Sequence, residues 1–228
     1  QGAPLLPVFH AALFARAGET RVVLNLGGIA NLTVLCADRS VLGFDVGPAN
    51  GLLDAWCALH SGEAFDRDGA FASRGLVDHA LLERLLDDGY FRAAPPKSTG
   101  REHFHLGWLG ARLDETSKPE DVQATLVELT ARSVADAVSA HANGAREILV
   151  CGGGVHNPLL MHALHSALAP RCVRTTAELA VDPDYIEAMA FAWLARERLA
   201  NRPGNLASVT GAQGPRMLGG VYSPFASE

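Results

Sequence analysis

The chain has 228 residues, of which 48% are hydrophobic and 19% are charged, so it can bury a large core as one domain or two small ones. Its net charge of -6 and its scattered basic residues argue against nucleic acid as a partner, because a phosphate backbone is bound by clustered lysines and arginines. A small molecule is therefore the expected partner. The longest apolar runs have the length of strands, so we expect no membrane span.

The cysteines and the first residues bear on the compartment and on the extent of the chain. Four cysteines lie far apart without a C-x-x-C pair, namely Cys36, Cys57, Cys151 and Cys172. This spacing fits reduced thiols and a cytoplasmic protein better than a disulfide framework or a zinc site. The chain begins at Gln1 without Met or a signal peptide, and we interpret it as a fragment.

Three short β-branched runs come first, at 21–26, 31–36 and 40–45. Gly27 and Gly28 separate the first two, which predicts a hairpin. Gly47 and Pro48 are expected to end the third strand. Apolar residues then recur at helical spacing, which predicts a helix beginning near Pro48: Leu52, Leu53, Trp56 and Leu59.

The second half of the chain alternates strands and helices. We expect a strand at 147–151, a helix at 158–168 with Asn157 as N-cap and Pro158 at N1, and a strand at 172–176. Ile186, Ala190, Trp193 and Leu194 mark a final helix, and the tail from Asn201 reads as irregular. The fold class is therefore α/β, in the order βββα, insert, βαβα.

The insert, at about 62–144, is predicted to be helical. It contains an amphipathic helix at 76–86, a loop at 93–100, and a long helix that is marked by Val122, Leu126, Leu129, Val134 and Val138.

Two glycine-rich turns, each directly after a predicted strand, suggest a nucleotide site. One follows Leu26 and the other follows Cys151. Glycine permits positive φ and brings backbone N–H groups close to a phosphate. Neither turn matches G-x-x-x-x-G-K-[ST] or G-x-G-x-x-G, which argues against a Walker-type or a Rossmann site.

The element order resembles the ribonuclease-H-like βββαβαβα half of an actin-like ATPase fold, in which ATP lies between two such halves. Six ordered motifs narrow this resemblance to the anhydro-N-acetylmuramic acid kinase family, over residues 1 to about 222. They are Gln1-Gly2-Ala3-Pro4, the 23–32 segment, Phe44-Asp45-Val46-Gly47-Pro48-Ala49-Asn50, the 97–102 segment, the 121–126 segment and Cys151-Gly152-Gly153-Gly154.

The resemblance implies a kinase of peptidoglycan recycling. It would convert 1,6-anhydro-N-acetylmuramic acid, ATP and water to N-acetylmuramic acid 6-phosphate and ADP, with Mg2+ bound mainly by phosphates and waters. Relatives carry an upstream lobe with a phosphate loop, so we expect residues 1–228 to be the C-terminal lobe of a two-lobe kinase, with the N-terminal lobe absent and little activity alone. Sugar kinases are often homodimers, but no motif here locates an interface.

Asp45 is the first candidate for catalysis. It ends a predicted strand beside a Gly-Pro break, where a carboxylate can accept a proton from a nucleophile, and the family's base occupies the matching place. The alternative is that Asp45 caps the following helix. Relatives usually read Asp-Thr-Gly-Pro-Gly-Asn, and this chain departs from that pattern at Val46 and Ala49.

The glycine turns supply the candidates for nucleotide binding. The first turn would face the β- and γ-phosphates through Gly27, Gly28 and Asn31. The second would lie against adenosine and its phosphates through Gly152, Gly153, Gly154 and Asn157. The alternatives are an ordinary hairpin turn and a tight strand-to-helix turn.

Glu187, near the start of the last helix, is the second catalytic candidate, because the resemblance places a sugar-contacting Glu there. Its alternative is an acid that complements the helix dipole. The loop Lys97-Ser98-Thr99-Gly100-Arg101 lacks the upstream glycine and the strand of a P-loop, and we interpret it as lying at the edge of the cleft without an assigned role.

No metal site in the protein is expected. Asp66-Arg67-Asp68-Gly69 lacks the bidentate Glu of an EF-hand and is interpreted as a solvated turn. The pairs His103 with His105 and His162 with His165 have no third or fourth ligand at diagnostic spacing.

Two other functions stay open at this point. One is a non-catalytic nucleotide-binding or scaffold module, which Val46 and Ala49 favour. The other is a kinase for an ordinary hexose, which would need no activated water.

Overall fold

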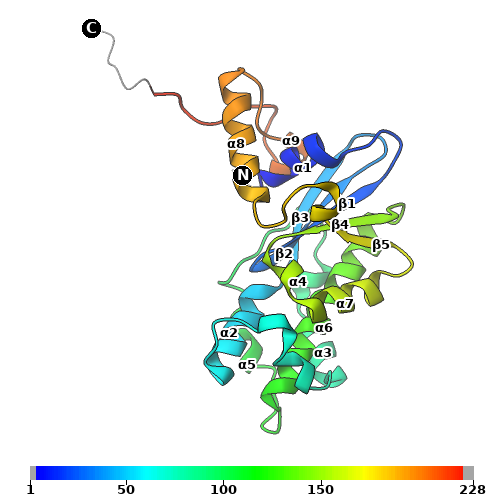
Figure 1. Cartoon of the computed structure of the whole chain (residues 1–228), viewed down its shortest axis with the longest axis vertical. Helices are drawn as coiled ribbons and strands as arrows, with labels where there is room; N and C mark the ends of the chain where they lie inside the picture. The colour runs from blue at the N-terminus through cyan, green and yellow to red at the C-terminus, as the bar shows by residue number, and fades with distance from the viewer. Residues whose placement is uncertain (1–3, 223–228) are drawn as a thin grey trace.

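The computed structural model describes residues 4–222, so Gln1, Gly2 and Ala3 of the first motif lie outside the described residues. In this range the chain forms strands β1 (Arg21–Leu26), β2 (Ile29–Leu35), β3 (Val41–Pro48), β4 (Glu147–Cys151) and β5 (Cys172–Thr175) (Figure 1). The helices are α1 (Leu6–Phe14), α2 (Asn50–Ser61), α3 (His79–Leu86), α4 (Gly89–Arg92), α5 (Leu106–Gly110), α6 (Pro119–His141), α7 (Pro158–Leu168), α8 (Ile186–Leu199) and α9 (Ala207–Thr210).

The strands form one mixed sheet in the order β3-β2-β1-β4-β5. The pairs β1–β2 and β2–β3 are antiparallel, whereas β1–β4 and β4–β5 are parallel. The predicted α/β class and the predicted hairpin are therefore confirmed. β1 and β4 run in the same direction, so the two glycine-rich turns that follow them lie at the same end of the sheet.

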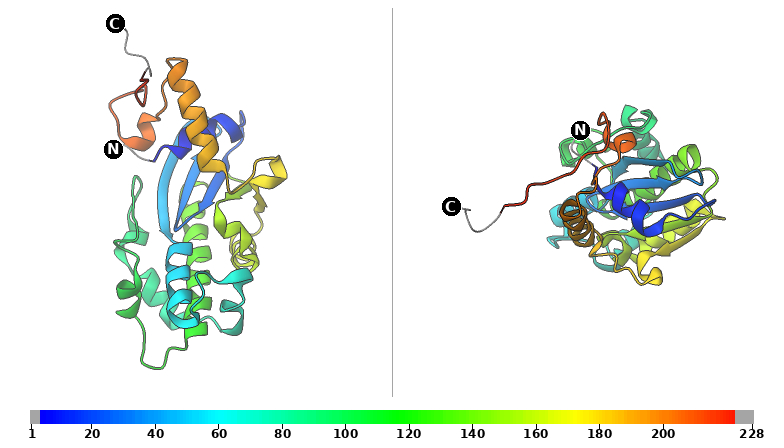
Figure 2. Two further views of the ribbon diagram at one scale, coloured as in Figure 1. Left: turned by 60° about the vertical axis from the view of Figure 1, so that its left-hand side comes forward. Right: turned by 90° about the horizontal axis from the view of Figure 1, so that it is seen from above.

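The two faces of the sheet bury different cores. Leu24, Leu32 and Phe44 lie on the face that α2, α3, α6 and α7 cover, and they belong to the larger apolar cluster. Val23 and Leu149 lie on the other face with Phe14 of α1 and Ile186 of α8. Figures 1 and 2 show α1, α8 and α9 at one end of the molecule and α2, α3 and α5 at the other.

The first helix, α1, was not predicted. It packs on β2 and β3, where the Nδ1 atom of the buried His10 lies 2.9 Å from Thr33 Oγ1. Burial lowers the pKa of His10 to about 4, so its ring is neutral at pH 7. Gly43 of β3 allows the close approach, because a Cβ at this position would lie 2.7 Å from Pro7 Cγ.

Two predicted boundaries were wrong. β3 does not end before Gly47 and Pro48 but continues through Pro48, where it pairs with Ile29 at the start of β2. The helix expected at 76–86 begins only at His79, because the Asp78 side chain caps it by accepting a hydrogen bond from the Leu81 N–H. Leu59, predicted to belong to the apolar face of α2, is 61% exposed.

The long helix α6 connects the helical end of the molecule to the sheet. Trp56 of α2 donates a hydrogen bond to the Pro119 carbonyl at its first turn, and Thr130 in its middle donates one to the Pro48 carbonyl of β3. Val134 and Val138 then pack in the larger apolar cluster, on the same face of the sheet as Leu24. The second half of α6 therefore covers the sheet, although it lies in the range interpreted as an insert.

A buried ion pair ties the beginnings of β1 and β4 together. Arg21 and Glu147 are partners in the parallel register, and their side chains form a salt bridge. Arg21 is 4% exposed and also donates to the Phe14 carbonyl over 3.2 Å, while Arg174 of β5 binds the second oxygen of Glu147 over 3.1 Å.

We expect the substitution Glu147→Gln to destabilise the folded protein by about 3 kcal/mol, because it removes the carboxylate that Arg21 shares with Arg174 and leaves the buried guanidinium with the largely exposed Glu19 carboxylate, 3.5 Å from its Nε. The matched change Asp136→Asn breaks the exposed Arg132–Asp136 pair (3.4 Å) and should alter the free energy of unfolding by less than about 1 kcal/mol. Urea unfolding of both variants measures the difference. Equal effects would show that burial of Arg21 does not matter.

Candidate functional site

Asp45 and Asn31 are partners on neighbouring strands, with Asp45 on β3 and Asn31 on β2. Asn31 pairs in turn with Asn25 of β1, and Asn25 pairs with Cys151 of β4. Laterally paired residues point to the same face of a sheet, so these four side chains form a row across four strands. We call Asp45, Asn31, Asn25 and Cys151 the polar row. It lies on the face that α1 and α8 cover.

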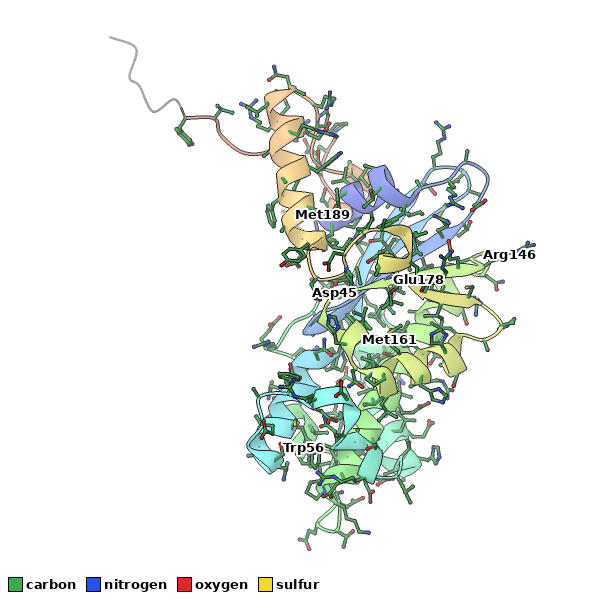
Figure 3. All side chains as sticks on the ribbon, viewed as in Figure 1. Asp45, Trp56, Arg146, Met161, Glu178 and Met189 are labelled. Carbon is green, nitrogen blue, oxygen red and sulfur yellow. The ribbon has the colours of Figure 1, made fainter. Side chains whose placement is uncertain are left out.

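A β-bulge directly follows Asp45. Ala30 pairs with Gly47 and Asn31 pairs with Asp45, which leaves Val46 without a partner on β2. Val46 is buried in the larger apolar cluster, on the face opposite the polar row. Bulges bend a strand and change the direction in which its side chains point. Figure 3 shows Asp45 near the middle of the long axis, between Met189 of α8 and Trp56 of α2.

Two hydrogen bonds to the Asp45 side chain come from the 97–101 loop. Ser98 Oγ donates to Oδ2 over 2.8 Å, and the Thr99 N–H donates to the same oxygen over 3.0 Å. Among the described residues none donates to Oδ1. The alternative that Asp45 caps the next helix is wrong, because α2 has Ala49 at its N-cap position and no side-chain cap.

The backbone of Asp45 is held by the same region. Its N–H donates to the Lys97 carbonyl over 3.2 Å, and its carbonyl accepts a hydrogen bond of 2.8 Å from the Tyr90 hydroxyl. Burial, and then the charge of Asp45, raise the pKa of Tyr90, so the phenol stays a neutral donor at pH 7. The ring of Phe91 lies against Gly47, where a Cβ would come within 2.7 Å of Phe91 Cε1.

The first glycine turn lies against the beginning of α2. The Gly27 carbonyl accepts a hydrogen bond of 3.1 Å from the Asn50 N–H, and the Gly28 carbonyl accepts one of 3.0 Å from the Gly51 N–H. Neither Gly27 nor Gly28 has a positive φ. Glycine is needed at 51 because a Cβ there would lie 3.0 Å from the Gly28 oxygen.

Arg101 lies beside the first glycine turn. A Cβ at Gly28 would lie 3.7 Å from two guanidinium nitrogens of Arg101. The 97–101 loop, for which the sequence suggested no role, therefore makes two contacts. Ser98 and Thr99 bind Asp45, and Arg101 lies against the hairpin turn. An exposed guanidinium at this place can neutralise an anion near the turn.

The second glycine turn does use positive φ. Gly152 has a φ of 82°, and a Cβ there would clash with the Asn25 side chain of the polar row. Gly154 packs on Leu26, whereas Gly153 is open to solvent. Asn157 caps α7 as predicted, since its Oδ1 accepts hydrogen bonds of 3.1 Å from the Leu159 and Leu160 N–H groups.

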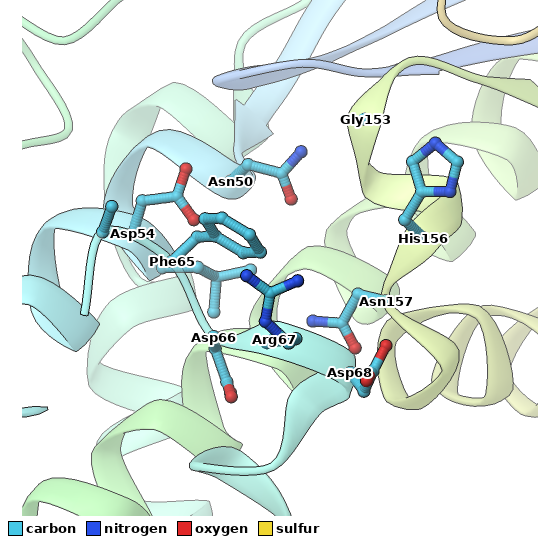
Figure 4. A pocket seen from close by; sticks show the side chains of 11 residues that line it. Asn50, Asp54, Phe65, Asp66, Arg67, Asp68, Gly153, His156 and Asn157 are labelled. Atoms are coloured by element: carbon cyan, nitrogen blue, oxygen red, sulfur yellow. The ribbon is translucent and has the colours of Figure 1, made fainter.

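A pocket of about 510 Å³ opens between the second turn, the first turns of α2 and the 64–68 segment (Figure 4). In Figure 4, Phe65 and Arg67 lie between Asn50 and Asp54 on one side and the Gly153–Asn157 turn on the other. The Arg67 guanidinium lies over the Phe65 ring at 5.1 Å from its centroid. An exposed aromatic ring and a cation in a cleft are suited to stack on and neutralise a flat, anionic ligand.

Glu187 lies in the first turn of α8, as predicted, and is exposed. The Gly152 N–H donates to the Pro183 carbonyl over 3.0 Å, which holds the start of α8 near the second glycine turn. Burial, and then the negative charge of Glu187, raise the pKa of the Cys151 thiol to about 12. Through the bond from Gly152, the start of α8 that carries Glu187 lies at the Cys151 end of the polar row, and Asp45 lies at the other end.

Ala49 has a φ of −137°, so this position does not require glycine for a positive φ. Ala49 is also buried, at 1% exposure. Val46 and Ala49 both belong to the larger apolar cluster, so neither side chain is part of the polar row.

The turn at 66–69, expected to be solvated, is so only in part: Arg67 and Asp68 are exposed, whereas Asp66 is buried. Asp66 is 8% exposed, and its carboxylate accepts hydrogen bonds from the Phe71 and Ala72 N–H groups over 2.7 and 3.0 Å. Within residues 4–222, no group of three or more His, Cys, Asp or Glu side chains is arranged to hold a metal ion. In the same range, no helix has the length and apolar character needed to cross a membrane.

Asp45 and Asn31 are direct partners on β3 and β2. Gly152 lies against the side chain of Asn25, the next residue of the polar row. Gly153 and Asn157 instead line the pocket. Gly27 and Gly28 lie outside that lining and bind the first N–H groups of α2 through their carbonyls. Sequence reasoning missed Ser98, Thr99 and Tyr90 as neighbours of Asp45. The only signal was the unexplained polar run at 97–101.

The second glycine turn yields a paired prediction. Gly154→Ala should destabilise the protein by about 1–3 kcal/mol, because the new Cβ would lie 2.5 Å from Leu26 Cβ in a packed core. Gly153→Ala meets nothing within 4 Å and should change stability by less than about 0.5 kcal/mol. Urea unfolding checks both, and equal stabilities would contradict the packing argument.

The cysteines yield a second prediction. All four are free, and Cys172 is exposed while Cys151 is buried. A thiol with a pKa near 12 stays protonated at pH 8, so maleimide should label Cys172 quickly and Cys151 only after unfolding. Peptide mapping of the labelled native protein is the measurement, with Cys172→Ser as the control. Rapid labelling of Cys151 would contradict it.

Comparison with known proteins identifies relatives along almost the whole chain. It is 59% identical over 223 residues to an anhydro-N-acetylmuramic acid kinase from Xanthomonas campestris and 56% identical over 228 residues to one from Burkholderia cenocepacia. These matches cover 97% of this chain but only 59% and 60% of the relatives, so the chain spans about three fifths of their length.

Among solved structures, an activator of 2-hydroxyisocaproyl-CoA dehydratase from Clostridium difficile with bound ADPNP superposes with a TM-score of 0.49 and 18% identity. It covers 86% of this chain and 68% of that one. A likeness at this level does not identify a function. The family model for anhydro-N-acetylmuramic acid kinase, in contrast, matches residues 1–224. The chain belongs to the anhydro-N-acetylmuramic acid kinase family.

Proposed function

We propose that the full-length protein containing this chain converts 1,6-anhydro-N-acetylmuramic acid, ATP and water to N-acetylmuramic acid 6-phosphate and ADP, in peptidoglycan recycling. Family membership supports the reaction. One observation supports the assignment of the site. Asp45 pairs with Asn31, and the polar row that contains them ends at Cys151, directly before the second glycine turn.

In this proposal Asp45 is the general base. Its Oδ1, to which no described residue donates, accepts a proton from water as the water oxygen bonds to the anomeric carbon and the bond from that carbon to O6 breaks. O6 then attacks the γ-phosphorus, and ADP leaves with the electrons of the bond between the β- and γ-phosphates. Glu187 is proposed to contact the sugar from the far end of the polar row.

The glycine turns are proposed to bind the nucleotide. Gly27, Gly28 and Asn31 would face the β- and γ-phosphates, where the nearby Arg101 supplies positive charge. Gly152, Gly153, Gly154 and Asn157 would lie against adenosine. The pocket between Phe65 and Gly153 offers about 510 Å³ for that group.

Mg2+ is proposed to be held mainly by the phosphates and by water, because no cluster of candidate ligands exists in residues 4–222. Bound to ATP, it would neutralise phosphate charge.

We also propose that residues 1–228 are the C-terminal lobe of a two-lobe kinase, a ribonuclease-H-like half of an actin-like ATPase fold with a helical insert at about 62–144. The strand order and the antiparallel and parallel pairings support this topology. Since the relatives are longer, the 228 residues alone are proposed to be nearly inactive. A homodimer and a cytoplasmic location complete the proposal.

The Asp45→Asn substitution should lower kcat by about 100-fold to 10,000-fold, because the amide cannot accept the proton from water. The assay uses the full-length protein with ATP, Mg2+ and 1,6-anhydro-N-acetylmuramic acid, and it measures the reducing sugar phosphate. Asp38→Asn is the matched control, since Asp38 is exposed in the turn before β3.

The outcomes separate the alternatives. A wild-type protein that binds ATP without forming product would favour a non-catalytic nucleotide-binding or scaffold module. Phosphorylation of an ordinary hexose without consumption of water would favour a different sugar kinase. Full activity of Asp45→Asn would remove Asp45 as the base.

A further inference from the structure

We propose that Ser98 and the backbone of Thr99 position the Asp45 carboxylate so that Oδ2 is fixed and Oδ1 is left to accept the proton. Ser98 is therefore a positioning residue in a segment for which the sequence suggested no role. The inference rests on the proposed function, because it concerns how the base of that reaction is held.

The hydrogen bonds to Asp45 are distributed unequally between its two oxygens. Ser98 Oγ and the Thr99 N–H both donate to Oδ2, over 2.8 and 3.0 Å, and no described residue donates to Oδ1. A carboxylate turns about its Cβ–Cγ bond unless one oxygen is fixed. Two donors on one oxygen fix the direction of the other, which is the geometric requirement for a general base.

The segment that makes these bonds is itself anchored. Lys97 Nζ donates to the Tyr90 carbonyl over 2.9 Å and lies 4.5 Å from the centroid of the Tyr90 ring. Tyr90 donates to the Asp45 carbonyl, and the Asp45 N–H donates to the Lys97 carbonyl. These contacts form a closed circuit from Asp45 through Tyr90 and Lys97 back to Asp45.

This circuit holds the 97–101 loop against Asp45 even though the Ser98 side chain is exposed. Each backbone group of Asp45 is hydrogen-bonded to one member, so the strand and the loop are tied together at this residue. Thr99 also carries a buried hydroxyl without a hydrogen-bond partner among the described residues. A buried unpaired hydroxyl in a polar site is a group that a bound water or substrate can satisfy.

The test is a kinetic double-mutant cycle on the full-length protein with ATP, Mg2+ and 1,6-anhydro-N-acetylmuramic acid. Ser98→Ala should lower kcat by about 10-fold to 100-fold, the loss expected for one hydrogen bond to a charged group. The KM for ATP should stay unchanged, because the Ser98 hydroxyl donates to Asp45 and, among the described residues, makes no hydrogen bond to either glycine turn. Ser98→Thr, which keeps the hydroxyl, should restore the lost turnover.

The cycle includes Asp45→Asn with and without Ser98→Ala. If Ser98 acts only through Asp45, adding Ser98→Ala to Asp45→Asn should cause no further loss. Ser40→Ala is the matched control, because Ser40 Oγ also donates to an aspartate, Asp38, over 2.6 Å in an exposed turn. It should leave kcat unchanged.

Three outcomes would overturn the positioning role: unchanged kcat in Ser98→Ala, an equal loss in the Asp45→Asn background, or a raised KM for ATP with unchanged kcat. An inactive wild-type protein would instead count against the proposed function.

Hydrogen exchange then tests the positioning contact without turnover. Asp45→Ala removes the acceptor of the Thr99 N–H and should speed exchange of that amide, whereas Ser40→Ala should not. Unchanged exchange at Thr99 in Asp45→Ala would overturn the inference.

Discussion

The hydrogen-bond register between β2 and β3 decides where the Asp45 carboxylate lies. Because side chains alternate between the faces of a strand, a slip of one residue would turn Asp45 into the apolar core and Phe44 toward the polar row. The bulge at Val46 shifts the register by one residue just after Asp45, and β3 goes on pairing with β2 as far as Pro48. The position of α2, whose first N–H groups bind the Gly27 and Gly28 carbonyls, depends on the same register.

The two faces of the sheet have different roles. One face packs Leu24, Leu32 and Phe44 against long helices and supplies most of the buried apolar surface. The other face carries a smaller core and, at the end where β1 and β4 lead into glycine turns, the polar row. Polar side chains are tolerated there because α1 and α8 cover the face only in part, which leaves Asn25, Asn31 and Asp45 half-buried.

The 97–101 loop connects features that are far apart in the sequence. Its carbonyl, hydroxyl and amide groups bind Asp45, and Arg101 reaches Gly28. Since β3 is the edge strand of the sheet, its outer backbone groups need partners, and Lys97 and Tyr90 supply them at Asp45. The loop therefore protects an edge and holds the candidate base at the same time.

The sequence by itself determined the strands, the hairpin, the cap of α7 by Asn157 and the candidate residues Asp45, Asn31 and Glu187. These features depend on local spacing, on turn chemistry and on ordered motifs, which can be read along the chain. It missed α1 and the end of β3, because Gly47 and Pro48 read as a break until pairing with β2 overrides local preference. Only the tertiary structure decided that Ser98 and Thr99 bind Asp45. Those residues lie 53 and 54 positions from it, and no local pattern encodes a contact made across a sheet edge.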